Sequence, residues 1–256
     1  MNYKILNSIT LISILLILGW IYWQNLSWCY LWIPMIGWLF IVLLVSANIR
    51  WNFFLKSVHK GKPAGRKIAL TFDDGPHPVY TPRVLEILEK YHAKATFFCI
   101  GKNIQTHPEI LKQTFKKGHC IGNHSFMHNK TIDFKGKNGW IKEIENTGLE
   151  ILKITGKKPK FFRPPYGVTT PHLAEALKKS EYLSIGWSQR TYDTMLSDFN
   201  KINQKILKNI KSGDIILLHD RHENIIPILE QLLPELARKN FTFVTVNELI
   251  DEEPYC

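Results

Sequence analysis

The sequence predicts an α/β protein in which a parallel sheet, open or closed into a barrel, follows two membrane-spanning helices. Three observations support this fold class. Residues 5–49 contain no Asp, Glu, Lys or Arg, and from about residue 66 onward short β-rich runs alternate with helical patterns. With 45% hydrophobic and 21% charged residues, the 256-residue chain is neither disordered nor of low complexity.

The uncharged segment is too long for one membrane helix, which needs about 20 apolar residues. A polar break at residues 24–27 divides it into Ile5–Trp23 and Tyr30–Ala47, and Trp and Tyr residues crowd around the break, as they do at membrane interfaces. We therefore read residues 1–49 as a membrane hairpin of two transmembrane helices. The alternative is a cleaved signal peptide, because Val45-Ser46-Ala47 resembles a cleavage site, although it follows two apolar segments rather than one.

Positive charge is concentrated beside this segment. The chain carries a formal net charge of +11, and residues 50–67 hold six positive residues and no acid. This pattern predicts a basic juxtamembrane linker at residues 50–66, with membrane lipid and no nucleic acid as a partner. By the positive-inside rule, Lys4 and the linker lie on the cytosolic side. We therefore expect a two-span protein of a bacterial inner membrane whose residues 67–256 form a catalytic domain at the cytosolic face.

The alternating region contains seven β-rich runs with helical patterns between them. We expect strands at Lys67–Phe72, Ala95–Ile100, Cys120–His124, Phe161–Arg163, Tyr182–Ile185, Asp214–His219 and Phe241–Val244. We expect helices at Thr81–Tyr91, Glu109–Lys117, Trp140–Ile154, Pro171–Lys179, Asn200–Ile210 and Ile225–Lys239. Strands that alternate with helices favour parallel pairing, and about 190 residues are enough for one such domain.

In parallel α/β folds, catalytic groups collect at the carboxyl ends of the strands. The first run ends in Asp73-Asp74-Gly75-Pro76, where the Gly-Pro turn can direct both carboxylates to one site, although a turn with a helix-capping Asp explains the same residues equally well. The fourth run ends in Arg163-Pro164-Pro165-Tyr166, which also fits a stiff loop. The sixth ends in Leu217-Leu218-His219, whose histidine would by itself be read as a core residue.

The third run leads into His124 and His128. Positions i and i+4 share one face of a helix, so these imidazoles could share a metal, although a surface pair is the simpler reading of this spacing alone. The addition of Asp74 gives two imidazoles and one carboxylate. Such a set leaves positions open for water and substrate, as a catalytic metal requires.

Asp-Asp, His-x-x-x-His, Arg-Pro-Pro-Tyr and Leu-x-His, in this order at successive strand ends, resemble the motifs of the NodB-type polysaccharide deacetylases, the fourth carbohydrate esterase family. The resemblance covers residues 67 to about 250 and does not extend to the membrane hairpin. It implies a distorted (β/α) barrel of about seven parallel strands. It also implies a divalent metal, most often zinc, held by Asp74, His124 and His128.

The same resemblance implies roles for further residues at the site. Asp73 would be the general base, oriented by Arg163. His219 would be the general acid, and Asp193 would set its charge state. The backbone around Pro165 and Tyr166 would bind the oxyanion, and Leu217 would line the acetyl pocket.

One segment departs from the family pattern, since Arg190 stands where an Asp is usual and Thr194 where a Trp is usual. This change bears on substrate preference more than on the reaction. We expect a membrane-anchored, metal-dependent hydrolase that removes N-acetyl groups from an amino-sugar glycan. A lipid- or nucleotide-linked sugar precursor, deacylated or deformylated at the cytosolic membrane face, is an alternative substrate. A non-catalytic sugar-binding module is an alternative function.

Overall fold

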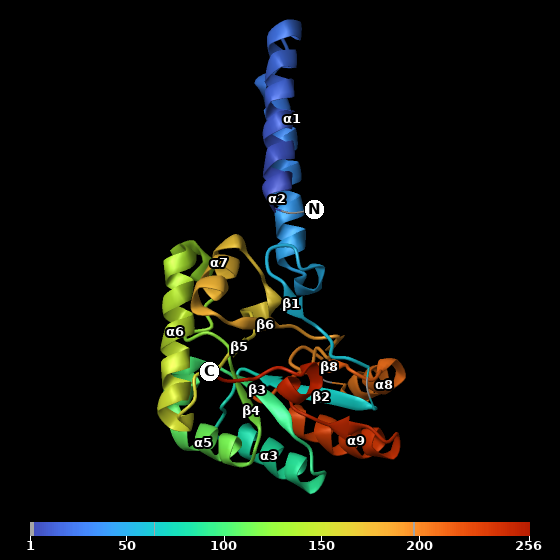
Figure 1. Cartoon of the computed structure of the whole chain (residues 1–256). Helices are drawn as coiled ribbons and strands as arrows, with labels where there is room; N and C mark the ends of the chain where they lie inside the picture. Colours follow the sequence, from blue (N-terminus) through green and yellow to red (C-terminus); the bar gives the residue numbers. More distant parts are fainter. Residues whose placement is uncertain (1–2, 64, 197) are drawn as a thin grey trace.

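The computed structural model describes residues 3–63, 65–196 and 198–256, and shows a helical hairpin that projects from an α/β domain (Figure 1). The helices are α1 (Tyr3–Gln24), α2 (Trp32–Ser46), α3 (Tyr80–Lys90), α4 (Gly101–Thr106), α5 (Pro108–Lys116), α6 (Gly136–Thr155), α7 (Pro171–Ser180), α8 (Phe199–Asn209), α9 (Ile225–Arg238) and α10 (Val246–Ile250). The six predicted helices of the domain are confirmed as α3 and α5–α9, whereas the short α4 and α10 were not predicted.

The described strands form one nine-stranded sheet. They are β1 (Ser57–Val58), β2 (Lys67–Asp73), β3 (Ala95–Cys99), β4 (Cys120–Asn123), β5 (Phe161–Phe162), β6 (Leu183–Ile185), β7 (Gln189–Arg190), β8 (Ile215–His219) and β9 (Thr242–Phe243). All pairings between them are parallel, in the order β1-β6-β5-β4-β3-β2-β8-β7, with β9 beside β2. This distorted half-barrel confirms the predicted fold class, and β1 and β7 add to the seven predicted strands.

Side-chain alternation along β2 decides which of its residues face the site. Ile68, Leu70 and Phe72 are fully buried in a cluster with the apolar residues of α3 and α9, on the outer face of the sheet. Successive side chains of a strand point to opposite faces, so Thr71 and Asp73 point into the half-barrel. The register of apolar residues in β2 therefore directs the Asp73 carboxylate inward.

The two N-terminal helices are long and apolar enough to cross a membrane: Tyr3–Gln24, and Trp28–Ser46, which joins a short 3₁₀ turn to α2. They lie side by side, and Trp38 Nε1 donates a 2.8 Å hydrogen bond to Oδ1 of Asn7 across the pair. The polar break predicted at residues 24–27 coincides with the turn between them. The hairpin of two apolar helices is thus confirmed.

The described part of the segment expected to be a linker, residues 50–63 and 65–66, packs against the domain. Its residues Ser57 and Val58 form β1, which pairs with β6 at one end of the sheet. Lys60 forms an ion pair with the buried Asp214 at 3.2 Å, and Arg66 donates to the carbonyl oxygen of Lys239. The exit of the hairpin is therefore attached to the sheet.

Candidate active site

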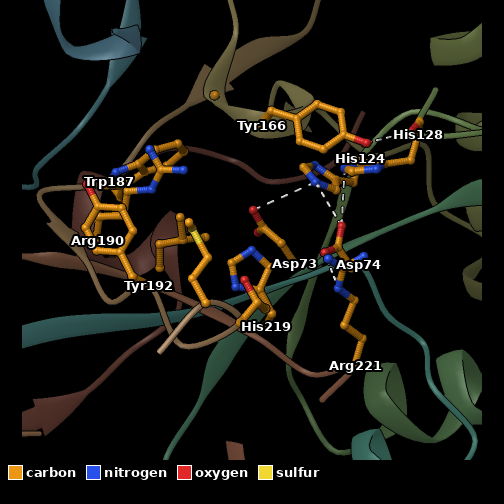
Figure 2. Close-up of a pocket in the computed structure, with 14 residues that line it drawn as sticks. Asp73, Asp74, His124, His128, Tyr166, Trp187, Arg190, Tyr192, His219 and Arg221 are labelled. Atoms are coloured by element: carbon orange, nitrogen blue, oxygen red, sulfur yellow. Dashed lines mark hydrogen bonds and ion pairs between the residues drawn. The ribbon is translucent and has the colours of Figure 1, made fainter. Parts of the chain in front are cut away.

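Four strands bring the predicted site residues to one edge of the sheet. Asp73 ends β2 and His219 ends β8, and the two are partners in the register of that pairing. His124 directly follows β4, and Arg163 directly follows β5. Figure 2 shows Asp73, His124 and His219 around one pocket, a cavity of about 160 Å³.

Asp74, His124 and His128 present three ligand atoms within 4.8 Å of one another. Asp74 Oδ1 lies 3.5 Å from His124 Nε2 and 3.3 Å from His128 Nε2. This oxygen is buried and has no hydrogen-bond partner among the described residues. A buried, unsatisfied carboxylate oxygen beside two imidazole nitrogens fits a divalent cation, because one ion would satisfy all three atoms. The predicted set of metal ligands therefore comes together in the fold.

Neighbouring groups keep the three ligands in the protonation states that bind a cation. Nδ1 of His124 lies 2.8 Å from the carbonyl oxygen of Arg163, which places the proton on Nδ1 and leaves Nε2 free. Burial, reinforced by the nearby His124, lowers the pKa of His128 to about 4, so that imidazole is neutral at physiological pH. Burial opposes ionisation of Asp74, but its interaction with the neighbouring His124 outweighs burial and holds the pKa of Asp74 below its ordinary value.

The prediction that His124 and His128 share a helix face is wrong. Residues 124–129 form a loop after β4, in which Ser125 and His128 have left-handed φ values of 64° and 50°. Glu143 of α6 holds the loop, since one of its carboxylate oxygens accepts the backbone N–H groups of Phe126 at 2.8 Å and Met127 at 2.7 Å. The two imidazoles meet because the loop turns back on itself.

Arg163 fixes the position of Asp73. Its guanidinium is fully buried and donates to Asp73 Oδ1 at 2.8 Å and to the Thr71 hydroxyl at 2.7 Å. Two backbone carbonyl oxygens, of Ile185 and Gly186, accept from Nε and Nη2 of the guanidinium at 3.1 and 2.8 Å. Asp73 Oδ2 is left to face the metal ligands, 3.8 Å from His124 Nε2. The arrangement presents one carboxylate oxygen to the place where a metal and water would meet.

The half-buried His219 forms a second pair with the buried Asp193. Asp193 Oδ1 lies 2.9 Å from His219 Nδ1, and Asp193 Oδ2 accepts the His219 backbone N–H at 2.8 Å. Burial alone would lower the pKa of His219, but the hydrogen bond to Asp193 and the charges of Asp193 and Asp73 outweigh it and raise the pKa to about 9. His219 therefore carries a proton at neutral pH and can donate it.

Of the three residues expected to bind substrate, Tyr166 and Leu217 line the pocket. Tyr166 has a left-handed backbone, with φ of 59°, and its hydroxyl donates to the carbonyl oxygen of His128 at 3.1 Å (Figure 2). Pro165 is buried and is not among the residues that line the pocket. Its place in the turn before Tyr166 makes it a support for that turn rather than a contact surface.

Comparison with known proteins places the chain in a family. The family model described as polysaccharide deacetylase matches residues 60–185. A peptidoglycan-N-acetylglucosamine deacetylase of Bacillus cereus is 39% identical over 191 residues, which are 72% of this chain and 87% of that protein. The chain belongs to the polysaccharide deacetylase family. It is thus a hydrolase of carbon–nitrogen bonds other than peptide bonds.

Further relatives of this deacetylase agree with the assignment. The peptidoglycan-N-acetylglucosamine deacetylase PgdA of Listeria monocytogenes is 33% identical over 188 residues, 73% of this chain but 40% of the length of PgdA. The crystal structure of the peptidoglycan N-acetylglucosamine deacetylase Bc1960 superposes with a TM-score of 0.72 at 30% identity, and covers 77% of this chain and 93% of that one. The match to the family model begins at residue 60, after the hairpin.

The structure of the deacetylase adds pocket residues that sequence reasoning missed. Arg221 Nε lies 3.1 Å from Asp74 Oδ2, the carboxylate oxygen opposite the one that faces the histidines. Tyr192 and Met195 also line the pocket, as do Arg190 and Trp187, although Trp187 is largely buried in the core. The position of Arg221 two residues after His219, at a strand end, was the available signal for it.

We expect the substitution Asp193→Asn to move the alkaline limb of the pH profile to lower pH. Loss of the carboxylate removes the interactions that raise the pKa of His219, so the acid loses its proton at lower pH. A shift of about 1–3 pH units in kcat/KM follows from the removal of one close charge. The measurement is kcat/KM for an N-acetylated oligosaccharide between pH 6 and 10, and an alkaline limb that stays in place would contradict the pairing.

Asp220, next to His219, is a buried carboxyl group outside the predicted set. Its Oδ2 accepts the Thr81 hydroxyl at 2.5 Å, and its Oδ1 has no hydrogen-bond partner among the described residues. Burial, opposed by the Thr81 hydrogen bond and reinforced by the charge of Asp74, raises the pKa of Asp220 to about 7. The folded protein therefore takes up a proton here at a pH where the unfolded chain does not.

We expect the free energy of unfolding of Asp220→Asn to rise relative to that of the native protein as the pH increases. Protonated Asp220 contributes to the free energy of unfolding of the native protein. This contribution is fully present below the unfolded-state pKa of 3.8 and is lost as the pH rises through the folded-state pKa of about 7. The difference between the two pKa values corresponds to roughly 4 kcal/mol, of which about 3 kcal/mol is lost between pH 5 and pH 8.5. Free energies of unfolding in urea at pH 5 and pH 8.5 test this expectation. An equal difference between variant and native protein at both pH values would show that Asp220 does not titrate in the fold.

Proposed function

We propose that the protein is a metal-dependent deacetylase that removes N-acetyl groups from N-acetylglucosamine in a glycan of the peptidoglycan type. The observation that carries this proposal is the complete constellation of Asp73, His219 and the three metal ligands in one pocket. A sugar-binding module has no use for a general acid and a general base beside a cation site. The names of the curated relatives support the substrate class.

Asp74, His124 and His128 would hold the metal, and zinc suits two imidazoles and a carboxylate. Such an ion polarises the amide carbonyl and lowers the pKa of water toward about 7. Asp73 Oδ2, held toward this site by Arg163, accepts one proton from the attacking water. General-base assistance of this kind contributes about 10²–10⁴ in rate.

His219, the partner of Asp73 on the neighbouring strand, completes the reaction. As the water oxygen bonds to the carbonyl carbon, the carbon–nitrogen bond breaks and the sugar nitrogen takes the proton from His219. The products are acetate and a free amine. The proton taken by Asp73 returns through solvent to His219, whose raised pKa favours its recharging at neutral pH. Leu217, which lines the pocket, supplies an apolar surface for the acetyl methyl group.

We propose that residues 1–49 anchor the enzyme in a bacterial inner membrane and that residues 67–256 form the catalytic domain, joined by residues 50–66. The six positive residues after the hairpin support a cytosolic domain. The relatives named for peptidoglycan, a polymer outside the membrane, support the opposite orientation. Protease accessibility of a C-terminal tag tests this orientation. Protection in intact cells and cleavage after permeabilisation would support a cytosolic site, whereas cleavage in intact cells would place the site outside.

We expect chelation to abolish acetate release from N-acetylglucosamine oligomers by the purified full-length protein. Readdition of Zn²⁺ should restore it, because the ligand atoms of Asp74, His124 and His128 lie close enough to bind one ion. Metal content by elemental analysis and acetate by an enzymatic assay are measured on the same samples. An O-acetylated sugar assayed in parallel distinguishes amide from ester hydrolysis. Full turnover by protein shown to be free of metal would reject the proposed chemistry.

A further inference from the structure

A second cavity adjoins the active-site pocket at the exit of the membrane hairpin. It measures about 430 Å³ and lies between residues 47–50 on one side and residues 187–190 on the other, with Lys205 of α8. It shares Trp187, Arg190 and Tyr192 with the active-site pocket. In Figure 2 these three side chains lie together at one end of the site, with the metal ligands toward the other end. A ligand in this cavity would therefore be adjacent to the reacting group.

The lining of this cavity is positively charged. Arg50, Arg190 and Lys205 contribute to it, and no acidic residue does. Among the described residues, none of the three cations has an acidic partner within 4 Å. The ring of Tyr192 supports two of them, with the Arg190 guanidinium 4.8 Å and Lys205 Nζ 4.9 Å from its centroid. We name this lining the cationic pocket.

The cationic pocket lies at the level where the hairpin meets the domain. The Ser46 carbonyl oxygen at the end of α2 accepts the Thr169 backbone N–H at 3.0 Å, and Ile49 is buried in the domain core. Arg50 is held at this junction because its guanidinium donates to the carbonyl oxygen of Ser188. With the hairpin in a bilayer, Arg50 lies four residues beyond α2, at the depth of lipid phosphates.

We propose that the cationic pocket binds the phosphate ester of a membrane-anchored amino-sugar phosphate, whose sugar then reaches the metal site. This inference rests on the proposed deacetylation and names a lipid-linked precursor, in place of the finished glycan, as the substrate class. Guanidinium groups recognise phosphate through paired hydrogen bonds, and three cations without an acid in one pocket favour a doubly charged group. A phosphate linked to a lipid carrier is held at this depth by its own anchor. A neutral polymer has no anionic group for these three cations to bind.

The test compares two probes that differ only in the phosphate. One is N-acetylglucosamine joined to a short prenyl chain through a diphosphate, and the other is the same sugar joined to the same chain by a glycosidic bond. Equilibrium binding of each probe to the full-length, metal-loaded protein is measured in neutral detergent. We expect the diphosphate probe to bind about 10–100-fold more tightly, the effect of a few hydrogen bonds to a charged group.

The variant Arg50→Gln, Lys205→Gln removes two of the charges and should reduce this preference at least tenfold. Lys208→Gln is the matched control, because Lys208 lies on the same helix, is exposed, and lines neither cavity. The same preference in the double variant and the control would overturn the proposal. So would a native protein that binds both probes equally.

Further measurements distinguish the proposed ligand from other possible occupants of the cationic pocket. If the pocket instead holds a phospholipid headgroup, vesicles with phosphatidylglycerol will bind the native protein better than the double variant, and the two probes will not differ in detergent. If a muropeptide with free carboxylates binds more tightly than the diphosphate probe, the occupant is the cell-wall polymer. Acetate release is measured in parallel. Its absence from both probes rejects the deacetylase function, whereas the binding ratio still decides the phosphate subsite.

Discussion

Replacement of Asp73 by Asn is expected to lower kcat about 10²–10⁴-fold while the metal content stays the same. Asn retains the shape of the side chain and an oxygen that can accept from Arg163, but it cannot take a proton from water. Asp73 is not one of the three metal ligands, so zinc binding should survive. The measurement is acetate release from an N-acetylglucosamine oligomer, together with the metal-to-protein ratio of each preparation.

A matched control separates loss of the base from loss of any carboxylate. Asp198 caps α8 and is exposed, and Asn is an equally good capping residue. Asp198→Asn should therefore retain full turnover. If Asp73→Asn keeps more than a tenth of the native kcat with full metal content, then another group removes the proton from water. If Asp73→Asn loses metal, the Asp73 carboxylate is itself part of the metal site.

The order of strands and helices could be predicted because hydrophobic patterning is a local signal. All seven predicted strands occur, and β2 shows why, since its run of buried residues is bounded by polar ones. The two missed strands, β1 and β7, have two residues each. Strands this short have no detectable period, and they exist because a neighbouring strand pairs with them. The attachment of the expected linker to the sheet was unpredictable for the same reason.

The site was predictable where its residues follow strands in recognisable motifs, as Asp74 and His128 do. Its supporting contacts were not. The loop from His124 to His128 was predicted to be helical because the i, i+4 spacing was the only local information. Its actual shape depends on Glu143, which is 15 residues further along the chain and comes from α6. Arg221 reaches Asp74 only because β8 pairs with β2, a contact that no local pattern contains.

Replacement of Arg163 by Leu is expected to reduce the free energy of unfolding by about 3–5 kcal/mol. The guanidinium is fully buried, and its loss leaves the Asp73 carboxylate without its cation and two backbone carbonyl oxygens without donors. For a domain of this size the loss corresponds to a fall in Tm of roughly 10 °C. Unfolding by urea and by heat, each compared with the native protein in the same detergent, measures the effect.

The double variant Asp73→Asn, Arg163→Leu shows where this loss originates. If the loss of stability comes from the unpaired Asp73 carboxylate, Asp73→Asn should recover about 1–3 kcal/mol of it. The reason is that Asp73→Asn removes the buried charge that Arg163→Leu leaves without a partner. If instead the cost comes from the cavity and the unsatisfied carbonyl oxygens, the double variant will be no more stable than Arg163→Leu. Arg163 would then be a packing residue, and its proposed role in orienting the base would have to rest on kcat alone.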